Sequence, residues 1–332
     1  MTTRRIIKIS FPILVLACIY FLGPQPTKPL YNATLPIVPA DATALEKYVE
    51  ARDKGHHIKF NNEGKIVWKD STKSKTEYVV VYMHGFSASQ MEGDPVHRRF
   101  AKEFGCNLYL PRLADHGVDT TEQLLLYTAD RAWQSAKDAL AVGKQLGDKV
   151  ILMGTSSGAT LALMLAAQYP KDVYALINLS PNIAINNPAA FIINNPWGLQ
   201  IARLVMHGKY KINKASDENS KYWNNKYRLE AAVQLEQILE DNMNAKTFSK
   251  IKQPSLTLYY YKNEKEQDPE VKVSAALEMN KRLGTHDSLK EAIAMPNAGA
   301  HVLASPLKSK DVEGVYKEIE KFALEKLKLV KD

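Results

Sequence analysis

Residues 149–170 are the stretch that most constrains how this chain can fold. They begin with the apolar residues 150–153, which predict a strand buried on both faces of a parallel sheet. Gly154-Thr155-Ser156-Ser157-Gly158 follows and fits the pattern G-x-S-x-G, with Ser156 at its centre. Residues 161–167 are apolar almost all round, which predicts a helix buried inside a larger protein. A strand, a tight glycine-flanked turn and a buried helix form the context in which such a serine acts as a nucleophile.

The composition of the chain suits one large globular domain with an insertion. Of its 332 residues, 45% are hydrophobic and 24% are charged. The formal net charge is +8, but positive and negative residues are interspersed, and no basic block carries interleaved aromatic residues. That pattern argues against a nucleic-acid partner. The two cysteines, Cys18 and Cys106, do not have the spacing of a metal site, and we expect no metal or organic cofactor.

The N-terminal segment, residues 1–23, has the pattern of a targeting or anchoring element. Basic residues precede residues 9–22, which are apolar with few interruptions. This run is shorter than the roughly 20 residues of a full transmembrane helix, and no small-x-small cleavage site follows it. We therefore predict an uncleaved membrane anchor that places the rest of the chain outside the cytoplasm. A cleaved signal peptide, which would give a secreted or periplasmic protein, is the alternative.

The next segment, residues 24–40, is rich in proline, which favours an extended stalk. The folded domain is predicted to span residues 41–332, with Asp41 as the N-cap of its first helix. Residues 58–60 and 66–68 are predicted to pair as a β-hairpin around a polar turn.

From residue 78 onward, apolar strand patterns and helical patterns alternate along the chain. The strands are expected at residues 78–83, 106–110, 150–153, 173–179, 256–260 and 289–295. This alternation predicts an α/β fold with a mostly parallel sheet, helices on both faces and an antiparallel start from the hairpin. Residues 182–253 interrupt the alternation and are predicted to form a helical cap insertion. Such an insertion would lie over the carboxyl ends of the strands, where open α/β sheets bind ligands.

Residues 78 to about 324 resemble the α/β-hydrolase superfamily, and within it the monoacylglycerol-lipase and carboxylesterase branch. Besides the serine turn, His84-Gly85-Phe86-Ser87-Ala88-Ser89 at the end of a predicted strand is similar to the oxyanion loop of that branch. Asp115-His116-Gly117 is similar to the loop after the next strand. The resemblance implies the α/β-hydrolase fold and a serine hydrolase reaction. It also implies that His84, Gly85 and His116 lie at the substrate pocket.

The chemistry requires further groups, because a serine hydroxyl needs a base that is oriented by a third residue. His301 is the candidate base, since it lies in a loop directly after the last predicted strand. Asp268 is the candidate acid; it precedes a proline and is predicted to cap the following helix. Glu264 in the same loop is its competitor. The chain order Ser156, Asp268, His301 is the order found in this fold.

The negative charge that develops on the substrate requires N–H donors, and the backbone of Phe86 and Ser157 is predicted to supply them. We therefore predict a serine hydrolase, similar to lipases and carboxylesterases, that cleaves a carboxylic ester through an acyl-enzyme on Ser156. A small ester is the expected substrate, with lipid-like esters among the candidates. An acyltransferase or a serine aminopeptidase could use the same three residues. A membrane-tethered binding protein without catalysis is the remaining alternative.

Overall fold

The computed structural model describes residues 15–332, and its centre is a seven-stranded sheet in the order β1-β3-β2-β4-β5-β8-β9. Its strands are β1 (Lys65–Val67), β2 (Thr76–Met83), β3 (Asn107–Leu110), β4 (Gly147–Thr155), β5 (Ala175–Leu179), β8 (Ser255–Tyr259) and β9 (Lys290–Ala294). β1 runs antiparallel to β3, and all other neighbouring pairs in this sheet are parallel. The prediction of a mostly parallel sheet in an α/β fold is confirmed.

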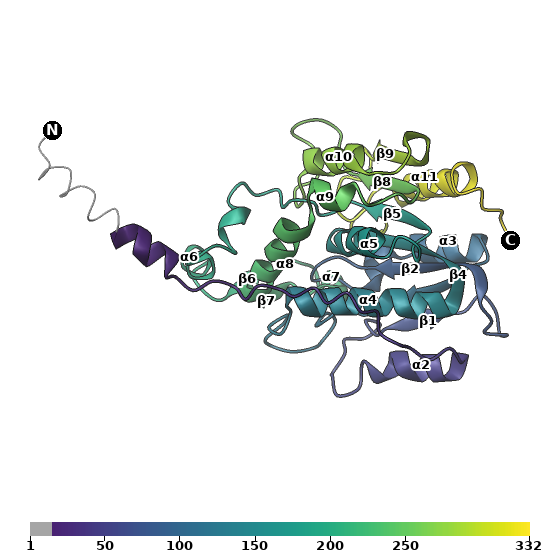
Figure 1. The fold of residues 1–332 in the computed structure, drawn as a ribbon, viewed down its shortest axis with the longest axis horizontal. Coiled ribbons are helices and arrows are strands. Elements are labelled where there is room, and N and C mark those ends of the chain that lie inside the picture. Colours follow the sequence, from purple (N-terminus) through teal and green to yellow (C-terminus); the bar gives the residue numbers. More distant parts are fainter. Residues whose placement is uncertain (1–14) are drawn as a thin grey trace, which may run out of the picture.

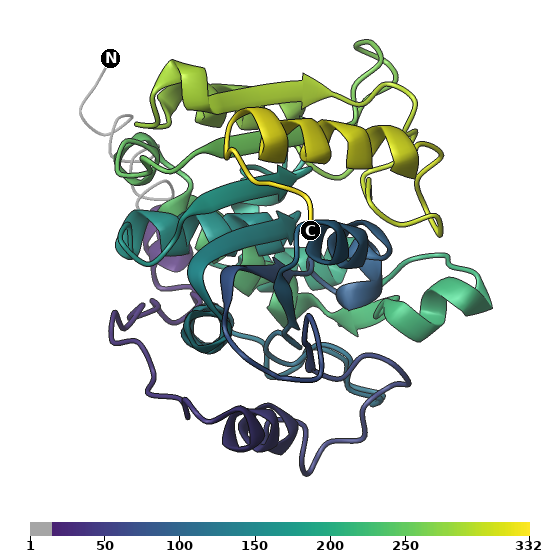
Figure 2. The ribbon, with the colours of Figure 1, turned by 90° about the vertical axis from the view of Figure 1, so that its right-hand side faces the viewer.

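Helices cover both faces of the sheet, because apolar side chains alternate between the two faces along each strand. Val79 and Val81 of β2 join the core under α2, α4, α5 and α10, whereas Val80 and Tyr82 join the core under α3 and α11. Figure 2 shows α11, in yellow, lying over its face of the sheet. The helices are α2 (Ala42–Ala51), α3 (Val96–Glu103), α4 (Ala129–Leu146), α5 (Ser157–Gln168), α10 (Val273–Arg282) and α11 (Val312–Glu325).

Between β5 and β8 the chain leaves the sheet and forms a separate group of elements. They are α6 (Gly198–Val205), β6 (Tyr210–Ile212), α7 (Asp217–Tyr222), β7 (Lys226–Arg228), α8 (Leu229–Asn242) and α9 (Ala245–Phe248). β6 and β7 pair with each other as an antiparallel ribbon. α8 contacts both α4 and α5, so this part of the insertion is attached to the helical layer of the main body.

The predicted pairing of residues 58–60 with residues 66–68 is wrong. β1 pairs with β3 instead, and the earlier segment forms only an isolated bridge with Val118. The cause is tertiary: Asn62 is 3% exposed, and its side-chain amide donates to the carbonyl oxygen of Lys221 at 3.0 Å. This contact holds the segment against the insertion rather than against β1.

The proline-rich segment, residues 24–40, is extended but does not form a free stalk, because it lies along α4 (Figure 1). Asp130, in the first turn of α4, accepts the backbone N–H groups of Leu30 and Tyr31 at 2.9 and 2.8 Å. About two turns further along the same side of α4, the ammonium of Lys137 donates to a backbone carbonyl of the same segment at 2.7 Å. The polar backbone of the extended segment thus finds its partners on the helix.

The predicted anchor, residues 1–23, falls partly outside the described residues, which begin at Val15. Residues 15–21 are helical, and Leu16 and Phe21 in this helix are 66% and 70% exposed. No helix formed by the described residues is long and apolar enough to cross a membrane.

The contact between Asp130 and the proline-rich segment predicts a measurable loss in Asp130→Ala. The substitution removes a charged acceptor from two backbone N–H groups, so the free energy of unfolding should fall by about 1–3 kcal/mol. Denaturant unfolding followed by circular dichroism measures this change. Asp148→Ala is the control: it breaks an exposed ion pair with Lys75 (3.4 Å) and should cost less than about 1 kcal/mol. Equal losses in the two variants would show that the segment is not held by Asp130.

Candidate active site

Ser156 occupies a strained turn between β4 and α5. Its φ of 54° and ψ of −121° lie outside the regions that residues with a side chain ordinarily adopt. The turn is held by its backbone, since Ser156 N donates to the oxygen of Leu179 at 2.9 Å and Asn182 N donates to the oxygen of Ser156 at 3.1 Å. Gly158 allows α5 to begin against the end of β2, because a Cβ there would lie 2.0 Å from the oxygen of Met83.

His301 and Asp268 form a direct hydrogen-bonded pair. Nδ1 of His301 lies 2.7 Å from Oδ2 of Asp268, and the side chain of Asp268 is fully buried. The other carboxylate oxygen, Oδ1, accepts the backbone N–H groups of Glu270 and Val271 at 2.9 and 3.1 Å. Three donors therefore fix this carboxylate, which in turn orients the imidazole so that Nε2 is left for chemistry.

The electrostatics of the pair favour an ionised acid beside a basic imidazole. Burial alone would lower the pKa of His301, but the charge and the hydrogen bond of Asp268 outweigh burial and raise that pKa above its ordinary value. Burial would likewise raise the pKa of Asp268, but His301 and the two backbone donors hold it below the ordinary value. His301 can therefore accept a proton while Asp268 remains charged.

The structure corrects the predicted reason for the position of Asp268. This residue does not cap α10, because the helix begins only at Val273. The turn that follows Asp268 supplies the backbone donors instead. Glu264, the competing acid, lies at the exposed tip of the same loop, where it accepts the hydroxyl of Tyr261 at 2.9 Å. The structure thus pairs Asp268, and not Glu264, with His301.

Ser156 and His301 lie at the carboxyl ends of parallel strands, since Ser156 follows β4 and His301 follows β9 in the same sheet. Within the described residues, no hydrogen bond joins Oγ of Ser156 to Nε2 of His301. Hydrogen bonds between nucleophile and base are often long without substrate and shorten in the reactive complex.

The loop after β2 is held by two buried histidines. His84 donates from Nδ1 to the oxygen of Gly85 at 2.9 Å and accepts at Nε2 from a backbone N–H after β3 at 3.1 Å. His116 accepts at Nε2 from the N–H of Ser87 at 2.9 Å and donates from Nδ1 to a carbonyl of its own loop at 2.8 Å. Burial lowers the pKa of both rings, that of His116 to about 4, so both are neutral.

These contacts correct the predicted substrate-binding role of His84 and His116, whereas that of Gly85 stays a prediction. The two imidazoles are only 1% and 3% exposed, and their nitrogens are all bonded to backbone, so they hold the loop rather than line the pocket. By contrast, the N–H groups of Phe86 and Ser157 donate to no other atom in the part of the chain that the structure describes. Both are therefore free to donate to another group, and their role as oxyanion donors stays a prediction.

The insertion reaches this loop through two residues that follow α7. Asn224 N donates to the oxygen of Ser87 at 2.6 Å. Trp223 is 8% exposed and packs against Ala88 and against Val302, which directly follows the candidate base. The insertion thus forms part of the wall around the catalytic loops.

Comparison with known proteins decides the family. The sequence model of the alpha/beta hydrolase family matches residues 80–311, well over half of the chain. The chain belongs to the alpha/beta hydrolase family. No curated protein matches it in sequence.

Solved structures share the fold at low sequence identity. A structure of the metagenome-derived lipolytic enzymes LipS and LipT is 18% identical with a TM-score of 0.63, covering 80% of this chain and 98% of that one. The monoacylglycerol lipase of Paleococcus ferrophilus is 14% identical with a TM-score of 0.57, and the match covers 78% of this chain and 96% of that one. A soluble variant of the monoglyceride lipase of Saccharomyces cerevisiae is 14% identical with a TM-score of 0.58, and the match covers 80% of this chain and 94% of that one. The resemblance stated from the motifs is confirmed at the level of fold and family.

This alpha/beta hydrolase also has a buried acid near the oxyanion loop that sequence reasoning missed. Glu92 lies in a short 3₁₀ helix, η1 (Gln90–Gly93), and is 2% exposed. Its Oε2 accepts the N–H of Gly85 at 2.5 Å, and burial raises its pKa to about 7. No spacing rule marks this position, so only the tertiary contact with Gly85 reveals it.

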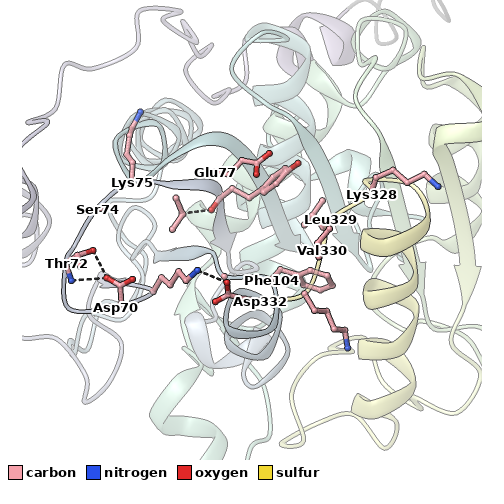
Figure 3. A pocket seen from close by; sticks show the side chains of 15 residues that line it. Asp70, Thr72, Ser74, Lys75, Glu77, Phe104, Lys328, Leu329, Val330 and Asp332 are labelled. Carbon is pink, nitrogen blue, oxygen red and sulfur yellow. Dashed lines mark hydrogen bonds and ion pairs between the residues drawn. The ribbon is translucent and has the colours of Figure 1, made fainter.

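A surface hollow of about 550 Å³ lies at the start of β2, whereas Ser156 follows the carboxyl end of β4. Figure 3 shows the side chains that line this hollow. The hollow is lined by residues between Lys69 and Lys75, the start of β2, Phe104 and Gly105 just after α3, and residues 328–332. Charged side chains there pair with one another, as Lys69 does with Asp332 at 2.8 Å. Within residues 15–332, no three His, Cys, Asp or Glu side chains are arranged to hold a metal ion.

The contrast between the two acids predicts different losses of turnover. Asp268→Asn should lower kcat by about 10³- to 10⁴-fold, because the amide no longer holds the required tautomer of His301 or stabilises its protonated form. Glu264→Gln should lower it by less than about tenfold, since an exposed charge contributes little. Steady-state kinetics beside thermal melts of both variants measure the difference. A dead Glu264→Gln enzyme with an active Asp268→Asn enzyme would reverse the assignment.

Proposed function

We propose that this protein is a serine hydrolase that cleaves carboxylic esters through an acyl-enzyme on Ser156. The observation that carries the proposal is the 2.7 Å pair of His301 and buried Asp268, in the chain order that this fold requires after a strained serine turn. A buried acid and a histidine with one free nitrogen are the groups that activate a serine hydroxyl.

In the proposed reaction, Nε2 of His301 accepts the hydroxyl proton as Oγ of Ser156 attacks the ester carbonyl. Asp268 keeps the proton on Nδ1 and stabilises the imidazolium that forms. The N–H groups of Phe86 and Ser157 receive the negative charge that develops on the carbonyl oxygen. His301 then protonates the leaving alcohol, and a water molecule activated by the same histidine releases the acid.

Esters with an apolar acyl chain are the proposed substrate class. Two similar structures are monoacylglycerol or monoglyceride lipases, and a third is of lipolytic enzymes. The walls around the catalytic loops support the same choice, because Trp223, Ala88 and Val302 form an apolar cluster there. Aromatic rings also surround Phe86, with the ring of Tyr227 5.1 Å away.

Probe labelling tests the nucleophile directly. A fluorophosphonate should label the wild-type enzyme, and Ser156→Ala should abolish labelling and lower ester turnover by at least about 10⁴-fold, since the acyl-enzyme cannot form. Ser157→Ala is the matched control; it keeps its backbone N–H and should still label. A panel of p-nitrophenyl esters from acetate to palmitate then defines the acyl chain. Labelling of Ser156→Ala, or its loss only in Ser157→Ala, would refute the choice of serine.

We also propose that residues 1–23 attach the enzyme to a membrane, with the hydrolase domain outside the cytoplasm. The basic and apolar pattern of this segment supports the proposal. So does the exposure of its apolar side chains, which reaches 84% at Leu22.

Fractionation tests the attachment. The full chain should sediment with membranes, whereas a chain starting at Thr27 should remain in the supernatant with unchanged kcat, because it keeps the contacts of Leu30 and Tyr31 with Asp130. N-terminal sequencing of the protein from its native host is the control. Cleavage before Leu35 would replace the proposed anchor with a signal peptide.

A further inference from the structure

Gly85 lies between the carboxylate of Glu92 and the nucleophile. A Cβ at Gly85 would lie 3.0 Å from both carboxylate oxygens of Glu92 and 3.0 Å from Cβ of Ser156. The carboxylate and the serine side chain therefore face the same side of one glycine, separated by little more than the space of a methyl group. Glu92 is 2% exposed and belongs to neither the acid–base pair nor the motifs.

We propose that Glu92 is a positioning residue for hydrolysis, which holds the oxyanion loop through the N–H of Gly85 and places a second negative charge near His301. This inference rests on the proposed function of Ser156, Asp268 and His301.

The first part of the role follows from the peptide groups around Gly85. Its N–H donates to Glu92 at 2.5 Å, and its carbonyl oxygen accepts from His84 at 2.9 Å. The C=O and N–H of a trans peptide point in opposite directions, so fixing the oxygen of Gly85 toward His84 aims the N–H of Phe86 to the other side. Glu92 holds the preceding peptide, the one that links His84 to Gly85. Hydrogen bonds to a charged acceptor are stronger than neutral ones, so an ionised Glu92 fixes that peptide, and with it the orientation of Gly85, more firmly than a neutral group would.

The second part follows from the charges around the site. Burial raises the pKa of Glu92 to about 7, whereas the hydrogen bond from the N–H of Gly85 and the positive charges of His301 and Lys308 favour its ionised form. Tyr82, also close to Glu92, is neutral because burial raises its pKa well above the ordinary value.

His301 is the group that gains a positive charge during the reaction. The negative charges that raise its pKa are those of Asp268, Glu92 and Glu270. Glu92 thus favours the imidazolium that forms in the transition state, in addition to Asp268.

Two substitutions separate the roles of the charge and of the acceptor. Glu92→Gln keeps an oxygen for the N–H of Gly85 and removes the charge, so it should lower kcat by about tenfold. Loss of that charge lowers the pKa of His301, so the acidic limb of kcat/KM should move to lower pH by about half a unit. Glu92→Leu also removes the acceptor and should lower kcat by about 10²-fold, the scale of a misplaced oxyanion donor. KM should stay unchanged in both variants.

Glu236→Gln is the matched control. Glu236 on α8 is 7% exposed and burial also raises its pKa to about 7, but it is not among the charges that act on His301. The control should leave kcat and the acidic limb unchanged, and thermal melts should show that all variants are folded.

The position of the acidic limb in Glu92→Gln decides the inference, even if the leucine variant does not fold. An unshifted limb in an enzyme that labels at Ser156 would overturn the role of Glu92 and leave the proposed function intact. Failure of the wild-type enzyme to label with a fluorophosphonate would instead overturn the proposed function itself.

Discussion

The backbone strain at Ser156 is the constraint on which the rest of the site depends. A residue with a side chain at φ 54° and ψ −121° costs about 1–3 kcal/mol, and it persists only where its surroundings leave no alternative. Here β4 is hydrogen-bonded to β2 on one side and to β5 on the other, and α5 begins against the end of β2 through Gly158. The strain is offset by a buried strand and a buried helix on either side of the turn. The parallel arrangement of the strands also brings the loops after β2, β8 and β9 to the same side of the sheet, at the carboxyl ends of the strands.

Elements whose residues interact mainly along the chain or with uniformly apolar surroundings could be predicted from the sequence. The strand and helix around Ser156 and the order of the three catalytic candidates belong to this group. The pairing of β1 with β3, the attachment of residues 24–40 to α4 and the buried position of Glu92 could not be predicted. Each depends on a partner that is distant in the chain, such as Lys221 for Asn62 or Asp130 for Tyr31. Local patterns contain no information on such partners.

Residues that precede the region matched by the family contribute to the candidate site. The ammonium of Lys59 donates to the backbone oxygens of Ser220 and Trp223 at 3.2 and 3.3 Å. These carbonyls belong to the end of α7 and the residue after it, where a cation is favourable because helix carbonyls there lack partners within the helix. Asn62 contacts the same helix end through Lys221. The segment that did not form a hairpin with β1 therefore places Trp223 against the catalytic loops.

Three histidines in loops at the carboxyl ends of the strands show how the hydrogen-bond partner determines the role of an imidazole. His84 and His116 are buried against backbone groups, and burial lowers the pKa of both because it outweighs the stabilisation of a positive charge by the carbonyl oxygens that they contact. His301 is buried as well, but its partner is a carboxylate, which raises its pKa. At neutral pH the first two are fixed hydrogen-bonding groups with one donor and one acceptor each, and only His301 has the basicity and the free nitrogen that proton transfer requires. Histidine content alone could not distinguish these roles, because the difference lies in the group that each Nδ1 contacts and in whether Nε2 is already bonded to the backbone.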